Sequence, residues 1–158
     1  MHTAIQQANR RFELLWWVIT ALILVVVLTP VYLYAKATYP FWWYNMLYVV
    51  AFITLSRYLF WLRFTFLAKK QKLKIVVALL CLPLAFYLVE GIYYFQEYID
   101  NEGLMILVEE APVHLQVNLG YYIKNQYVLF GVGSIVSTGA FAIRLIISVW
   151  RLHNRGTV

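Results

Sequence analysis

The sequence is poor in charged residues. They make up 13% of its 158 residues, whereas a soluble domain carries about 25%. Hydrophobic residues reach 63% and aromatic residues 18%. A water-soluble fold of this length cannot bury so much apolar surface, so a lipid bilayer must cover the excess. The composition therefore excludes an ordinary soluble domain and indicates an integral membrane protein.

Cysteine and histidine are also scarce. The one cysteine, Cys81, lies within an apolar run, so it can form neither an intrachain disulfide nor a CxxC redox pair. The three histidines, His2, His114 and His153, all lie outside the apolar runs, which excludes a bis-histidine haem site within the membrane. Phosphate-binding loops, zinc-protease motifs and nucleophile-elbow motifs are missing as well. We therefore expect no catalytic residues, no cofactor and no metal site.

Long apolar runs are what the sequence has in abundance. Four of them span residues 12–34, 41–67, 75–99 and 127–150. The first covers roughly 34 Å as a helix, enough for a hydrocarbon core of about 30 Å. It is too long for the hydrophobic part of a signal peptide, so we expect it to be retained. The sequence predicts an all-α membrane protein, a four-transmembrane-helix bundle that forms a single integral membrane domain over residues 1–158.

The segment 100–124 separates the third and fourth runs. Between residues 113 and 119, valine and leucine alternate with His114, Gln116 and Asn118. A period of two is typical of a strand, and residues 109–112, which include a proline, could form the turn of a hairpin. We favour a short extramembrane hairpin here, and an interfacial segment lying on the membrane is the alternative.

Lysine and arginine determine the expected orientation, because cytoplasmic loops are enriched in them. One side of the predicted bundle carries eight of these residues and the other carries only Lys36 and Lys124. The eight are Arg10, Arg11, Lys69, Lys70, Lys72, Lys74, Arg151 and Arg155. We expect both termini in the cytoplasm and segment 100–124 outside, in a bacterial inner membrane.

The net charge of +6 does not indicate nucleic-acid binding, because the basic residues lie at the ends of apolar runs and no soluble basic domain is present. Basic residues beside a membrane attract anionic lipids. We expect this role for the most basic stretch, which contains Lys69, Lys70, Lys72 and Lys74.

Glu90 is the most informative polar position. It lies within the third run, where a carboxylate is energetically costly and is usually functional. Helical spacing places Tyr87, Tyr94 and Glu97 on the same stripe. Asn45 and Tyr48 of the second run lie at a similar depth. The stripe could form an outward-facing intramembrane site for a cation, a proton or a polar substrate. The alternative is a protonated, hydrogen-bonded Glu90 that only stabilises the bundle.

Arg57 and Arg144 lie in the inner halves of the second and fourth runs. Together they could bind an anion or a lipid headgroup. The alternative is that their long side chains extend to the cytoplasmic interface. We do not expect Arg57 to pair with Glu90, because their depths differ by roughly eight residues, or about 12 Å.

The fourth run has a stripe of small residues. Small residues spaced four apart let helix backbones approach closely, so we predict a helix-packing interface here, within the chain or between chains. Its members are Gly131, Gly133, Ser134, Ser137 and Thr138.

These patterns favour a non-catalytic subunit or accessory protein of a larger membrane complex. It would contact other membrane subunits, or a second copy of itself, through the small-residue face of the fourth helix and the outer segment. The alternative is a small oligomeric transporter, channel or lipid-handling protein that uses the Glu90 stripe. A membrane enzyme is a third hypothesis, and it would need Glu90, Glu97 or the acidic outer segment together with a metal.

Overall fold

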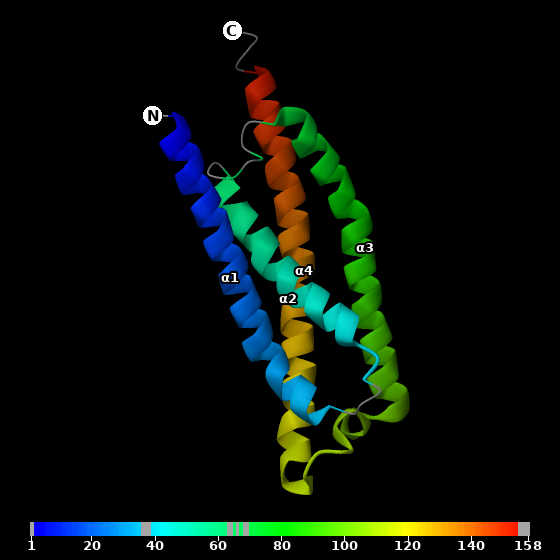
Figure 1. Ribbon diagram of the computed structural model, residues 1–158. Coiled ribbons are helices and arrows are strands. Elements are labelled where there is room, and N and C mark those ends of the chain that lie inside the picture. Colours follow the sequence, from blue (N-terminus) through cyan, green and yellow to red (C-terminus); the bar gives the residue numbers. More distant parts are fainter. Residues whose placement is uncertain (1, 36–38, 63–64, 66, 68–69, 155–158) are drawn as a thin grey trace.

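The computed structural model describes residues 2–35, 39–62, 65, 67 and 70–154, and it describes side chains from Arg11 onward except at residues 152 and 153. Within these residues the fold is all-α. Four α-helices are present: α1 (His2–Tyr34), α2 (Trp42–Trp61), α3 (Gln71–Glu102) and α4 (Val113–Asn154), and a short 3₁₀ helix, η3 (Leu104–Val108), lies between the last two. Figure 1 shows their arrangement.

Three of these helices are long and apolar enough to cross a membrane: α1 from Arg11, α3, and α4 up to Arg151. The chain is therefore a helical protein with three candidate membrane-spanning helices. The remaining helix, α2, is not among these candidate membrane-spanning helices. Its 20 residues include Asn45, Ser56 and Arg57, which lower its apolar character.

The helix α4 is the centre of the bundle, because α1, α2, α3 and η3 all pack against it. Figure 1 shows α2 crossing α4 diagonally, with its first turns near α3 and its last turns near α1. The start of α1, the end of α4 and the start of α3 lie at one end of the bundle. The end of α2 lies toward this end as well, and η3 lies at the opposite end.

The structure changes one predicted boundary. The second apolar run was expected to be helical over 41–67, but α2 ends at Trp61. Within the described residues beyond it, Leu62 and Leu67 are buried and the Thr65 hydroxyl donates a 2.8 Å hydrogen bond to the Leu62 carbonyl. Leu62 and Leu67 belong to the apolar cluster around Phe141 and Leu145 of α4.

The predicted hairpin over 100–124 is wrong. The helix α3 continues to Glu102, and α4 begins at Val113. Leu115 and Leu119 are partly buried while Val113 and Val117 are exposed. These two pairs have the four-residue spacing of a helix, so the alternation of apolar and polar residues was misleading. The 3₁₀ helix η3 packs against α4, with Leu104 and Met105 next to Gly120.

An aromatic cluster fills the interior toward the η3 end. Tyr127 of α4 stacks on Phe95 of α3, with ring centroids 3.9 Å apart. Its hydroxyl donates to the Gly91 carbonyl at 3.0 Å, and the Tyr48 hydroxyl donates to the Leu88 carbonyl at 2.7 Å. Buried tyrosines need such partners, and here they bind α2 and α4 to the backbone of α3.

Gly91 is required at this contact because α2 lies directly against it. A methyl group added at Gly91 would overlap the Tyr44 ring and the Tyr48 hydroxyl. The absence of a side chain therefore allows the close approach of α2 to α3, which in turn permits the Tyr48 hydrogen bond.

We predict that Gly91→Ala destabilises the protein by about 1–3 kcal/mol, because an overpacked core has to move its neighbours apart. Gly139→Ala is the matched control, since nothing lies within 4 Å of a methyl group added there. The denaturation midpoint in mixed detergent micelles measures the difference. Equal midpoints for the two variants would show that the α2–α3 contact is looser than described.

Candidate functional site

Arg57 forms an ion pair that joins α1 to α2. Its side chain is only 4% exposed, and its Nη2 atom lies 2.6 Å from the Glu13 carboxylate. The guanidinium also lies over the rings of Phe12, Trp16 and Tyr58, with its carbon 5.2–5.9 Å from their centroids. Cation–π contacts of this kind stabilise a desolvated cation. A carboxylate and three aromatic rings therefore compensate the buried charge.

The sequence analysis missed Glu13. It lies two residues after Arg11, near the first predicted residue of the span. Because α1 and α2 run in opposite directions, a residue near the start of α1 shares its depth with a residue near the end of α2. Matching charged residues by depth would therefore have paired Glu13 with Arg57. The structure agrees with the expectation that Arg57 does not pair with Glu90.

The structure divides the predicted Glu90 site between the interior and the surface. Asn45 and Tyr48 are fully buried, whereas Glu90 and Glu97 are exposed on α3. The remaining members, Tyr87 and Tyr94, are 37% and 46% exposed. The predicted residues therefore do not surround one common cavity.

Two aromatic residues, Phe41 just before α2 and Tyr44 in its first turn, lie beside the Glu90 stripe. Tyr44 stacks on Tyr87 with ring centroids 5.2 Å apart, and Phe41 contacts Tyr94 at 5.1 Å. Glu90 lies close enough to Tyr44 to interact with it electrostatically. Among the described residues, however, Glu90 has no ion pair and no hydrogen bond.

Asn45 lies near a buried tyrosine of the segment between α1 and α2. Burial raises the pKa of the Tyr39 hydroxyl, and the neighbouring Asn45 amide lowers it by less. The two groups do not reach hydrogen-bond geometry, and both polar atoms of the Asn45 side chain are buried without a partner. Tyr39 is therefore a neutral hydroxyl at physiological pH.

The small-residue stripe of α4 packs within the chain. A methyl group at Gly133 would lie 2.8 Å from the Phe52 ring, and one at Gly131 would lie 3.0 Å from Ile92. The Ser137 hydroxyl lies 3.0 Å from that of Ser56, within hydrogen-bond distance. Ser134 and Thr138 are fully buried and donate to backbone carbonyls one turn earlier. The helices α2 and α3 thus cover this face, so it is not free for another protein.

The other basic residues predicted to bind anions, Arg144 and the lysines at 69–74, do not form one common site with Arg57 among the described residues. Arg144 is exposed, and no described interaction joins it to Arg57. Lys70 and Lys72 are exposed, while Lys69 lies outside the described residues. Lys74 differs from its neighbours, because it is 3% exposed and its amine donates to the Ser148 hydroxyl at 3.0 Å.

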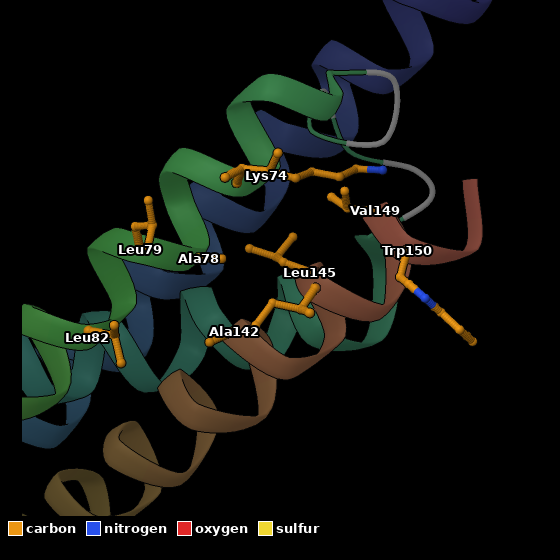
Figure 2. Close-up of a pocket in the computed structure, with 10 residues that line it drawn as sticks. Lys74, Ala78, Leu79, Leu82, Ala142, Leu145, Val149 and Trp150 are labelled. Carbon is orange, nitrogen blue, oxygen red and sulfur yellow. The ribbon is translucent and has the colours of Figure 1, made fainter. Parts of the chain in front are cut away.

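An apolar groove of about 420 Å³ runs between the first half of α3 and the last half of α4. Figure 2 shows Lys74 at one end of it, with its amine directed across toward α4. Leu79, Leu82 and Leu145 are among the apolar residues that line it. We call this cavity the α3–α4 groove.

Within the part of the chain that the structure describes, no group of three or more His, Cys, Asp or Glu residues is arranged to hold a metal ion. No family model, curated protein or solved structure matches this chain. The function has to be argued from the placement of its own side chains.

We predict that Glu13→Gln destabilises the protein, because it leaves the Arg57 charge buried without a carboxylate. Breaking a buried ion pair costs about 3–5 kcal/mol, and the value here belongs near the lower limit because the Glu13 side chain is 24% exposed. Arg57→Met should cost less, since a partly exposed carboxylate is left behind. The free energies of unfolding of the two single variants and of the double variant, measured in mixed detergent micelles, give these losses of stability. Additive losses in the double variant would contradict a direct interaction.

Proposed function

We propose that α2 is a fourth membrane span and that both ends of the chain are cytoplasmic. At 20 residues, α2 reaches about 30 Å, the thickness of the hydrocarbon core. Its most polar side chains, Asn45 and Arg57, are buried in the bundle and do not face lipid. The bias of basic residues toward the end where α1 starts and α4 ends supports this orientation. The membrane we propose is a bacterial inner membrane.

Single cysteines test this topology in a Cys81→Ser background. Lys72 in the first turn of α3 and Glu109 directly after η3 are both exposed. The start of α3 and η3 lie at opposite ends of the bundle (Figure 1). We predict that Glu109→Cys reacts with an impermeant maleimide added outside intact cells, and that Lys72→Cys reacts only after the membrane is opened. Labelling of both positions from the same side would rule out the four-span topology.

We further propose that the protein is a non-catalytic subunit of a larger membrane complex and binds its partner through α3. The observation that carries this proposal is the exposed Glu90 side chain within an apolar surface. Phe86 and Tyr93, one turn to each side on the same face, are 76% and 70% exposed. We call the surface formed by Phe86, Glu90 and Tyr93 the Glu90 face.

The position of Glu90 in the membrane makes an unpaired carboxylate costly. It lies one turn inward of Tyr93 and Tyr94, at the level where an aromatic belt meets the hydrocarbon. An ionised side chain at the centre of a span costs about 2.5–3.5 kcal/mol, and less toward its ends. Arg57 avoids this cost through Glu13, but Glu90 has no equivalent among the described residues.

A partner helix can supply the missing interaction. The complementary surface is a transmembrane helix with a lysine, an arginine or another hydrogen-bond donor near the outer membrane interface. Phe86 and Tyr93 would pack on each side of this contact and exclude lipid from it. Because α2 and α3 already cover the small-residue face of α4, the Glu90 face takes the docking role that the sequence assigned to α4.

We predict that Glu90→Gln reduces the amount of co-purified partner at least roughly tenfold, since truncating one member of a buried charge pair at an interface costs about 2–5 kcal/mol. Glu97→Gln is the matched control, because it removes the same charge two turns further outward on α3. Quantitative mass spectrometry of material extracted from native membranes, normalised to this chain, gives the ratio. Equal partner recovery from both variants would contradict the proposal.

A photoreactive amino acid can test the same surface independently. When it replaces Phe86, it should form a covalent cross-link to one other membrane protein. Placed at Phe60 of α2, which is similarly exposed at 68%, it should react with lipid alone. A product between two copies of this chain would instead support the transporter or channel hypothesis. Under that hypothesis Glu90→Gln abolishes transport in reconstituted vesicles and leaves the assembly intact.

A further inference from the structure

The α3–α4 groove has the dimensions of a ligand site and lies at the surface of the bundle, where Leu79, Leu82 and Ile146 of its lining are exposed. Its volume of about 420 Å³ lies within the roughly 300–1,000 Å³ typical of small-molecule sites. From Lys74 to Leu82 it follows α3 for about 12 Å. Apart from Lys74 and the Trp150 indole nitrogen, its walls are aliphatic or aromatic carbon, as Figure 2 shows.

Lys74 gives this groove a positively charged end. An ammonium group has three donors, and the Ser148 hydroxyl accepts one of them. No carboxylate pairs with Lys74 among the described residues, although the residue is almost completely buried. A buried cation without a counter-charge is unfavourable, so an anion at this end of the groove would stabilise the folded chain.

The surroundings of this end correspond to the membrane interface. Trp150 lines the groove there and is 62% exposed, as expected for an indole at the headgroup level. Lys70 and Lys72 at the start of α3 and Arg151 at the end of α4 are exposed nearby in sequence. They add positive charge to the side of the membrane on which the groove ends.

We propose that the α3–α4 groove is a binding site for an anionic phospholipid of the cytoplasmic leaflet. One acyl chain occupies the apolar groove, and the phosphate lies beside the Lys74 amine. An uncharged lipid would leave Lys74 without a counter-charge, and a soluble phosphate would leave the groove unfilled. A phospholipid satisfies both requirements at once, and it is available wherever α3 and α4 face the bilayer. The groove does not include Glu90, which lies two turns beyond Leu82 on α3.

The test uses the full chain, purified in mild detergent and stripped of lipid. It is then mixed with phosphatidylglycerol or with phosphatidylcholine of identical acyl chains, and native mass spectrometry counts the lipids retained. We expect one phosphatidylglycerol per chain to be retained roughly fivefold better than phosphatidylcholine, the preference expected for one lysine at an anionic surface. Glycerol phosphate, the soluble headgroup alone, should not displace it.

Three variants and one control locate the bound lipid. Ala142→Phe fills the groove and should abolish retention of both lipids, and Ala78→Leu serves the same purpose if the larger residue prevents folding. Lys74→Gln should keep an acyl chain in the groove but remove the preference for phosphatidylglycerol. Lys124→Gln, which removes an exposed lysine from the other half of α4, should leave both quantities unchanged.

Several results would overturn this site. Unchanged retention in Ala142→Phe would place the lipid elsewhere, and an unchanged preference in Lys74→Gln would remove the role of the buried amine. Full displacement by glycerol phosphate would reduce the site to a phosphate site without an acyl chain. A dimer that Ala142→Phe dissociates would show that a second copy of this chain, and not lipid, covers the groove.

Discussion

The close packing of α2 against α3 and α4 is the constraint on which the rest of the structure depends. The helix α2 carries Asn45, Ser56 and Arg57, and lipid cannot satisfy such groups. Asn45 is fully buried in this packing, and Arg57 is buried against Glu13 and the rings of α1. Gly91 and Gly133 leave space for Tyr44 and Phe52 of α2, and Gly131 leaves space for Ile92 of α3. The small residues of α4 therefore serve the internal packing of the chain. Any partner must bind to a different surface.

The fold treats the charged residues Arg57 of α2 and Glu90 of α3 differently. Arg57 is enclosed by Glu13 and three aromatic rings, so its charge is compensated within the chain. Glu90 faces outward between Phe86 and Tyr93 without a described partner. A compensated charge indicates a structural role, whereas an exposed and uncompensated one indicates a surface that is completed by another molecule. This difference is the basis of the subunit proposal.

The sequence predicted the helical class and the positions of the apolar helices well, because long apolar runs have few alternatives. It failed at residues 113–119, where alternation suggested a strand, because the packing of η3 against Gly120 cannot be read from local periodicity. It also missed Glu13, since a contact between two helices depends on their relative depth and rotation. The burial of Lys74 was equally hidden, because its three neighbouring lysines suggested a uniform basic surface.

The most direct test of the subunit proposal is the mass and composition of the particle extracted from its native membrane in mild detergent. The proposal predicts a particle that contains this chain and at least one different membrane subunit in a fixed ratio. A homogeneous particle made of this chain alone, with its bound lipid, would contradict the proposal.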